Sequence, residues 1–445
     1  MITLDDARLP FDLPIKQARA VAPLGDRIMH VVLYICILSS FFVFVQPAPY
    51  EYLAVLLGIA CVAAGVTVNR MVIPLLILLL IRDGSGAIAL QQVLQYPDAT
   101  RFLATSFYLG LTSTMFACIV AQDTMRRLAT LRSAYIMSGV LASLAGTMGY
   151  FDLYFKFLPG LEVFSMNDRA VAGFKDPNVL GCFLIPPLMW LIEGFIVDKI
   201  RLHNLIASII IFIGLLLAFS RAAWGSFAFA VALLMYFLFV TQKDLRLHKR
   251  IMFFVVAGAL AGVVMFALLT SIDVVNQMFV QRATVLQEYD SGGAGSRFGL
   301  QQNSLREIFD HPFGMGPWGF AKVYGLVSHN TFLGTMLNHG WVGGIAYLVL
   351  IALTLGIGFR ALWVRTPWQT FLIATYMPFL ALVLEGFVVD TDHWRHFYLL
   401  TGIVWGLVMA TQKAVWRASQ NLPNSEEVVD ARMQLFPKNS EKTAS

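Results

Sequence analysis

Long apolar runs alternate with short polar connections along almost the whole chain. About twelve runs reach the roughly 17–23 residues with which an α-helix crosses the hydrocarbon core of a membrane. They lie near residues 28–46, 50–68, 71–90, 102–121, 134–150, 177–197, 204–220, 222–240, 251–271, 341–359, 369–389 and 396–412. The run at 71–90 is the least regular, because Arg82 and Asp83 interrupt it. The pattern predicts an all-α integral membrane protein with about 12 transmembrane helices.

One long polar interruption separates the ninth and tenth runs. We therefore expect a large loop at 272–340, between helices 1–9 within 28–271 and helices 10–12 within 341–412. A loop of this length is usually functional or disordered, and its many Phe, Trp, Leu and Gly residues argue against disorder. The pattern predicts an active-site loop, with a polar N-terminal segment at 1–27 and a polar tail at 413–445.

Lysine and arginine gather in alternate connections. They are dense near 126–132 and 243–250, whereas the connection from Gln46 to Tyr50 carries neither. Cytoplasmic loops of membrane proteins carry the excess of positive charge, so both termini are predicted to be cytoplasmic. The loop at 272–340 then faces the periplasm or the outside. Residues 1–27 are polar and charged, so no signal peptide is expected there.

Composition supports a membrane protein and narrows its function. The chain is 58% hydrophobic and 13% charged, whereas soluble domains carry about 25% charged residues. Its net charge of +5 comes mainly from short basic loops and gives no reason to expect nucleic-acid binding. The four cysteines all fall in apolar runs and are expected to be small core residues.

Several catalytic motifs are absent from the sequence. There is no Walker A loop, no HExxH, no GxSxG and no clustered aspartate pair to hold a divalent ion. This argues against an ATP-driven pump, a metalloprotease and a serine hydrolase. We expect no metal and no cofactor.

Arg221 stands in a very short turn between two apolar runs, on the side where positive charge should be scarce. A guanidinium at membrane depth is costly and usually marks a functional site. Its planar, permanently charged donors suit a phosphate. The alternative is a structural arginine that extends to the lipid headgroups.

Arg297 opens a segment with helical character that should end at the His-Pro pair at 311–312. Leu305, Ile308 and Phe309 are predicted to form its apolar stripe. An anion could use Arg297 together with the free amides of this helix N-terminus. The alternative is an ordinary solvated arginine. A tight, irregular path is then expected at Gly314, Gly316, Pro317 and Gly319.

His329 lies between hydroxyl and amide side chains at the predicted membrane edge, in the sequence SHNTF. An unperturbed imidazole suits a general base near neutral pH, although a lone histidine is more often structural. His311 and His339 are expected to be mainly structural.

An earlier outer loop, NDRAVAGFKDPN, contributes further polar residues. Arg169 and Lys175 could contact an anionic ligand. Asp176 before Pro177 is typical of a helix N-cap followed by proline at the first helical position. With Asn178 and Asn330, the residues considered as substrate contacts are Arg169, Lys175, Asn178 and Asn330.

The ordered set of motifs resembles the O-antigen ligase and O-antigen polymerase superfamily, which includes exopolysaccharide polymerases. The resemblance rests on Ser220-Arg221, the helix led by Arg297, HPFGMGPWGF from His311, SHNTF from Ser328 and HGWVGG from His339. It covers roughly residues 169–344 by motif and the whole chain by topology.

The resemblance implies a multi-pass protein of the bacterial inner membrane with a large periplasmic loop. Such enzymes transfer a glycan from undecaprenyl pyrophosphate to a sugar hydroxyl, without a metal. By motif, Arg221 and Arg297 correspond to the arginines thought to grip the pyrophosphate, and His329 to the loop histidine. The acceptor is another glycan for a polymerase and a lipid A core for a ligase, and the shared motifs leave both open. Contact with other polysaccharide export components also fits the resemblance.

The main alternative is a transporter or flippase that binds lipid-linked saccharide without cleaving it. Transporters concentrate polar groups near the bilayer midplane on broken helices. Here the arginines and histidines gather at the outer rim, which favours the enzyme.

Overall fold

The computed structural model describes residues 24–45, 47–156, 160–282 and 295–421. Most of the predicted N-terminal segment, the end of the predicted tail and residues 283–294 of the predicted loop lie outside them. The described chain is almost entirely helical, as predicted. Its single small sheet pairs β1 (Ser165–Met166) with β2 (Arg169–Ala170) in antiparallel orientation.

Every predicted apolar run coincides with a helix. These helices are α1 (Leu24–Leu38), α2 (Pro49–Ala63), α3 (Ile73–Leu90), α4 (Pro97–Val120), α5 (Thr124–Phe155), α6 (Pro177–Val197), α7 (Leu202–Leu217), α8 (Arg221–Thr241), α9 (Leu245–Thr270), α14 (Thr331–Leu362), α15 (Gln369–Glu385) and α16 (Arg395–Asn421). The predicted loop contains α10 (Asp273–Arg282), α12 (Arg297–Asp310) and α13 (Gly319–Tyr324). Short 3-10 helices are η1 (Ser39–Phe41), η2 (Arg70–Val72), η3 (Gln91–Val93) and η4 (Leu161–Phe164).

Nine of the described helices are long and apolar enough to cross a membrane. The apolar helices α2, α7 and α15 are shorter, with 15, 16 and 17 residues. At 1.5 Å per residue such helices extend about 24 Å, less than the roughly 30 Å hydrocarbon core. The fold is therefore that of a multi-pass α-helical membrane protein.

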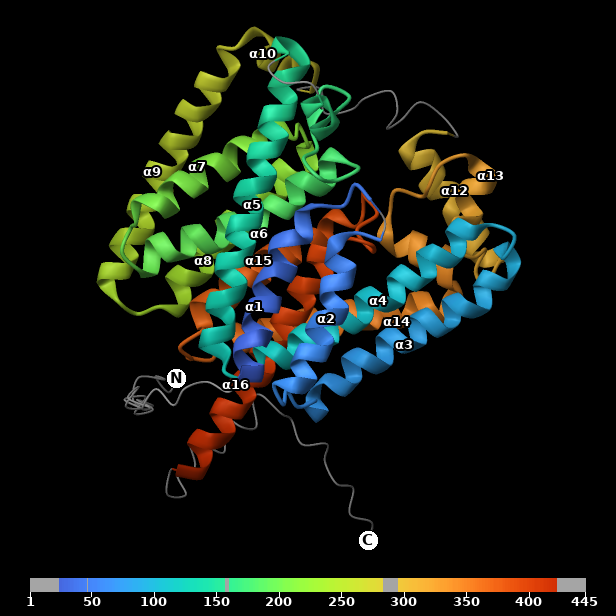
Figure 1. Cartoon of the computed structure of the whole chain (residues 1–445), viewed down its shortest axis with the longest axis horizontal. Helices are drawn as coiled ribbons and strands as arrows, with labels where there is room; N and C mark the ends of the chain where they lie inside the picture. Colours follow the sequence, from blue (N-terminus) through green and yellow to red (C-terminus); the bar gives the residue numbers. More distant parts are fainter. Residues whose placement is uncertain (1–23, 46, 157–159, 283–294, 422–445) are drawn as a thin grey trace, which may run out of the picture.

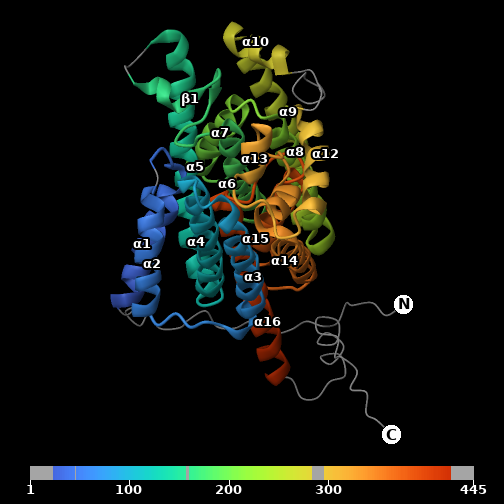
Figure 2. The ribbon, with the colours of Figure 1, turned by 90° about the vertical axis from the view of Figure 1, so that its right-hand side faces the viewer.

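The helices form one bundle around α6 (Figures 1 and 2). In its most apolar window α6 is 89% buried, whereas the corresponding window of α9 is only 6% buried, so α6 is central and α9 peripheral. The helix pairs with the most extensive contacts are α3 with α14, α4 with α16, α1 with α2, α5 with α7 and α8 with α15. In Figure 2, β1 and α10 lie toward the top, and the C-terminal part of α16 extends from the opposite end.

Arg82 and Asp83 do not interrupt α3, because both side chains are buried and satisfied. Arg82 Nε donates to Asp83 Oδ1 at 2.7 Å, and its Nη2 donates to the Ser106 carbonyl at 3.2 Å. Its Nη1 donates to the Tyr398 hydroxyl. The pair therefore ties α3 to α4 and α16 within the bundle.

The glycine-rich segment after α12 takes the tight path that the sequence predicted. Gly314 and Gly316 have φ of +83° and +79°. Gly340 interrupts the helical geometry of α14 with φ +70°, and a Cβ there would lie 2.6 Å from the Phe313 carbonyl carbon. Hydrogen bonds from Met315 N to Leu337 O and from Trp341 N to Pro312 O hold the segment against this kink.

The helix predicted from Arg297 exists as α12 and ends at His311, but of its predicted apolar stripe only Ile308 is buried. Leu305 and Phe309 are 51% and 72% exposed. The buried side chains are Leu300, Ser304 and Ile308, spaced four residues apart and so on one helical face.

Candidate active site

The four helices α6, α8, α12 and α14 each begin with a side chain that caps the first turn. Such a cap satisfies an amide that the helix itself leaves without a partner. In α6, Asp176 Oδ1 accepts from Asn178 N at 2.7 Å, and in α8, Ser220 Oγ accepts from Ala223 N at 3.3 Å. In α12, Ser296 Oγ accepts from Gly299 N at 3.2 Å, and in α14, Asn330 Oδ1 accepts from Phe332 N at 3.0 Å. The predicted N-cap at Asp176, with Pro177 following, is confirmed.

Two side chains connect these helix starts. Arg169, in β2, donates from Nε to the Ala218 carbonyl just before α8 and from Nη2 to Asn178 Oδ1 in the first turn of α6, both at 2.9 Å. Gln301, in α12, donates from Nε2 to the His329 carbonyl at 3.2 Å and to the Phe387 carbonyl at 3.1 Å. Arg169 therefore fixes α6 beside α8, and Gln301 fixes α12 beside the start of α14.

The starts of α6, α12 and α14 also interact through their charges. The charges of Arg297 and Asp176 both act on the His329 imidazole. Each helix start carries partial positive charge, because its amides point outward along the helix axis. Helix starts of this kind, together with arginine side chains, favour an anionic ligand.

Arg221 is the first residue of α8 and is partly exposed. The turn before it is tight, since Phe219 adopts φ +45° and Ser220 caps the helix. Phe279 of α10 packs over this turn, with its ring centroid 5.1 Å from those of Phe219 and Trp224. The predicted loop therefore covers the helix start that presents Arg221.

His329 has a left-handed backbone, with φ +50°. Its side chain is about one-third exposed, at 36%. Burial lowers the pKa of the His329 imidazole below its usual value, and the positive charge of Arg297 lowers it further, while Asp176 raises it. The structure thus brings together Arg297 and His329, two of the predicted site residues.

Asp390 completes this cluster and was missed by the sequence analysis. Its Oδ2 lies 3.9 Å from His329 Nδ1. Its carboxylate also accepts backbone hydrogen bonds from His329 and Asn330. Burial and, to a smaller extent, the charge of Asp392 raise the pKa of Asp390 to about 7.

The connection that carries Asp390 runs from Gly386 to Trp394, between α15 and α16. It is joined to the start of α14 by Thr331, whose N donates to Gly386 O at 2.7 Å and whose Oγ1 donates to Val389 O at 3.0 Å. The sequence signal was the dense polar run VDTDHWRH between the last two apolar runs.

Three of the four residues predicted as substrate contacts, Arg169, Asn178 and Asn330, form hydrogen bonds within the protein. Arg169 is buried and holds α6 and α8, Asn178 accepts from Arg169, and Asn330 caps α14 while its Nδ2 donates to Phe387 O at 3.1 Å. Lys175 is exposed. Whether any of them touches a substrate stays a prediction.

His311, His339 and the four cysteines have the structural roles expected. His311 ends α12, and its Nδ1 lies 3.1 Å from Glu307 O. His339 is buried within α14, 4.0 Å from Asp83. All four cysteines are buried and unpaired. Across the described residues, no three His, Cys, Asp or Glu side chains are placed to hold one metal ion.

The fold and this cluster define a multi-pass membrane protein with an anion-favouring site at the edge of its helices. Residues 206–348 match the family model described as O-antigen ligase. The chain is also 27% identical over 192 residues to an O-antigen polymerase of Salmonella muenchen. That alignment covers 41% of this chain and 46% of the relative, so it spans less than half of the relative's length. The two matches confirm the predicted resemblance to the O-antigen ligase and polymerase superfamily. The family match includes Arg221, Arg297 and His329.

Proposed function

We propose that this protein is a metal-independent glycosyltransferase that acts as a polysaccharide polymerase or ligase. Its donor is a glycan linked to undecaprenyl pyrophosphate, and its acceptor is a sugar hydroxyl at the periplasmic face of the inner membrane. The family match over residues 206–348 supports the class of reaction. The donor and the orientation in the membrane rest on the sequence motifs and on the distribution of basic loops.

The leaving group is held by Arg221 and Arg297. As the bond between the anomeric carbon and the pyrophosphate oxygen breaks, negative charge grows on the pyrophosphate. Guanidinium groups pair with phosphate oxygens through two parallel donors, and the starts of α8 and α12 add partial positive charge. Stabilisation of developing charge is commonly the largest contribution to catalysis.

His329 is the general base. Its neutral imidazole takes the proton from the attacking hydroxyl while the new carbon–oxygen bond forms. Asp390, 3.9 Å from Nδ1, is placed to stabilise the imidazolium that results. The reaction balances without another reactant: the proton passes to His329, and the electron pair of the broken bond leaves with the lipid pyrophosphate.

The observation that carries this proposal is that His329 lies 3.9 Å from Asp390 and close enough to Arg297 for the guanidinium charge to lower the imidazole pKa. A cation for the leaving group and a carboxylate-supported base are the two elements that this displacement needs. The chain brings them together from α12, the start of α14 and the connection before α16.

The competing function is transport of a lipid-linked saccharide without bond cleavage. The buried Arg82–Asp83 pair is the polar feature of α3 that such a function could use, but hydrogen bonds to Ser106 and Tyr398 already occupy it. The cluster around His329 lies instead at helix starts, where a reaction site open to the periplasm is expected.

Reconstitution tests the two functions. The purified protein is placed in liposomes with lipid-linked glycan from a strain that lacks this chain. The enzyme should release undecaprenyl pyrophosphate and produce a longer or transferred glycan, also in excess EDTA. Intact lipid-linked glycan moved across the bilayer would instead establish a transporter, and activity lost in EDTA and restored by magnesium would establish a metal requirement.

The acceptor is decided by the products of the deletion strain. Acceptors capped with single repeats indicate a lost polymerase, whereas accumulated long lipid-linked chains indicate a lost ligase. We favour a polymerase, since the aligned Salmonella muenchen protein is described as an O-antigen polymerase. Contacts with other polysaccharide export components are expected in either case.

A further inference from the structure

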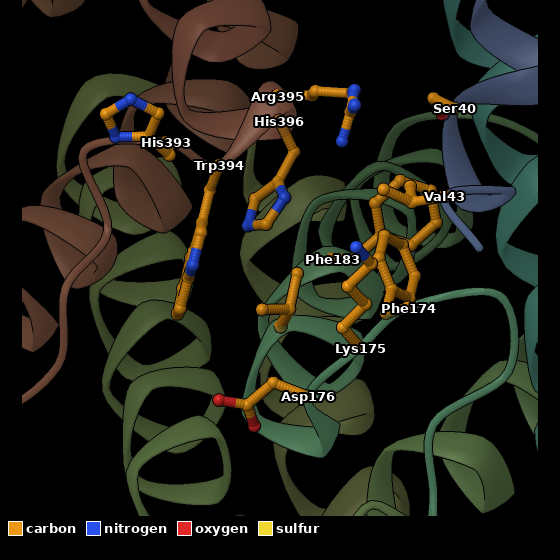
Figure 3. Close-up of a pocket in the computed structure, with 11 residues that line it drawn as sticks. Ser40, Val43, Phe174, Lys175, Asp176, Phe183, His393, Trp394, Arg395 and His396 are labelled. Carbon is orange, nitrogen blue, oxygen red and sulfur yellow. The ribbon is translucent and has the colours of Figure 1, made fainter. Parts of the chain in front are cut away.

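A cleft lies beside the candidate active site, between the segment before α6 and the first turn of α16 (Figure 3). Phe174, Lys175 and Asp176 form one wall, and Trp394 and His396 belong to the wall opposite. Asp176 also caps α6, and its charge raises the pKa of His329. The cleft and the cluster around His329 therefore share Asp176.

His396 has an unsatisfied polar atom in this cleft. Its side chain is 3% exposed, and its Nε2 is buried without a hydrogen-bond partner among the described residues. Figure 3 shows the imidazole directed into the cleft, next to Trp394. A buried polar atom without a partner is unfavourable, so this position calls for a ligand that can donate to or accept from an imidazole.

The rest of the lining identifies the chemistry of that ligand. The indole of Trp394 lies 5.3 Å from the His396 ring, and Phe174 and Phe183 pack 5.0 Å apart in the apolar wall. Lys175 and Asp176 supply a donor and an acceptor at the polar side. Arg395 also lines the cleft, but its Nε donates to Glu51 Oε1 at 3.0 Å, so the fold already uses it. Apolar and aromatic walls with a few placed polar groups are typical of small-molecule sites.

A sugar ring matches this lining. It presents carbon–hydrogen bonds on its faces and hydroxyl groups along its edge. The faces suit the aromatic walls, and the hydroxyl groups suit His396, Lys175 and Asp176. A lipid chain would leave the buried His396 nitrogen without a partner, and a pyrophosphate would lie against the Asp176 carboxylate.

We propose that this cleft binds a sugar ring of the acceptor glycan, with His396 as its buried polar contact. The assignment rests on the proposed function, because it presumes a donor held elsewhere. In a direct displacement the attacking hydroxyl and the leaving pyrophosphate lie on opposite sides of the anomeric carbon. Arg221 and Arg297 hold the pyrophosphate and neither lines the cleft, so the cleft is left for the acceptor.

Binding of a lipid-free sugar tests the site apart from the reaction. The probe is the repeat oligosaccharide, released by mild acid from the lipid-linked glycan and titrated against the detergent-solubilised full-length protein by calorimetry. His396→Ala and Lys175→Ala should each weaken binding about tenfold, which corresponds to loss of roughly one hydrogen bond. His396→Gln, which keeps a donor and an acceptor, should recover part of the affinity. Arg221→Ala should leave it unchanged, because the probe has no pyrophosphate.

A matched control is His248→Ala, since His248 lies in the first turn of α9, which follows the end of α8 opposite Arg221. Lys175 is exposed, so its variant tests the cleft even where the His396→Ala protein fails to fold. Affinity unchanged in Lys175→Ala, or in a His396→Ala protein that folds, would overturn the proposal, as would a wild-type protein that does not bind the probe. The two proposals can also fail separately. If the protein binds the probe through this cleft but never cleaves the lipid-linked donor, the sugar site stands and the proposed transferase function is refuted.

Discussion

His329 and Asp390 meet at the start of α14, with 3.9 Å between Nδ1 and Oδ2. The carboxylate also accepts from the backbone N–H groups of His329 and Asn330. Burial lowers the pKa of His329 and raises that of Asp390 to about 7. Both shifts bring the pKa values of the two groups closer together, which suits a pair that accepts and releases the proton of a sugar hydroxyl.

Asp390→Asn should lower kcat by about tenfold or more, because the imidazolium loses its neighbouring negative charge. It should also remove the rise in activity near pH 7, at which Asp390 ionises in the wild type. Donor KM should change little. The measurement is the initial rate against pH, with Asp310→Asn in the exposed pair with Arg306 as the control. A variant with wild-type kcat and an unchanged pH profile would remove Asp390 from the mechanism.

The charges around His329 determine at which pH the activity falls. His329 can act as a base only when neutral, so activity falls as pH drops through the pKa of its imidazole. Burial and then Arg297 lower that pKa, so this fall should lie below the usual value of about 6.5, separate from the change that Asp390 produces near pH 7. Arg297→Gln should move the fall to higher pH, and Asp176→Asn should move it to lower pH. Profiles of kcat/KM from pH ~5 to ~8 decide this, and shifts in the same direction for both variants would contradict it.

Arg221→Lys should fail nearly as badly as Arg221→Ala, although it keeps the positive charge. Both should lower kcat/KM by about 10²-fold or more, because an ammonium does not reproduce the paired donors of a guanidinium. The control is Arg246→Lys in the first turn of α9, at the far end of α8. Near wild-type rates for Arg221→Lys would favour a structural arginine that reaches the lipid headgroups.

The orientation in the membrane can be tested by labelling introduced cysteines, because the native cysteines should react little with a thiol reagent. All four native cysteines are buried. Phe313→Cys and Leu245→Cys place new thiols at positions that are 71% and 74% exposed. A membrane-impermeant maleimide added to intact cells should label the first and not the second until the cells are lysed. The reverse pattern would place the candidate site in the cytoplasm.

The helices were predictable because their signals are local, whereas the site depended on tertiary packing. Apolar length located every helix of the bundle, and Asp176 before Pro177 located the start of α6. No local signal places Asp390 beside His329, since α14 and α15 separate them in sequence and Thr331 joins their segments in space. The buried face of α12 was missed for the same reason. Tertiary packing buries Leu300, Ser304 and Ile308, although Phe309 is more apolar than Ser304.

His329→Ala should abolish transfer and leave donor binding largely intact. In the proposed reaction the arginines bind the pyrophosphate, whereas the imidazole acts only on the acceptor hydroxyl. Loss of a general base typically costs about 10²–10⁴-fold in rate, so kcat should fall by that factor while the affinity for lipid-linked glycan stays near wild type. His311→Ala is the matched control, because His311 is also in the loop and beside a carboxylate, with its Nδ1 3.1 Å from Glu307 Oε2. Because His329 carries a left-handed backbone, His329→Asn keeps a residue type that tolerates this conformation and separates loss of the base from loss of the turn. An active His329→Asn enzyme would make His329 structural and return the choice of base to Asp390.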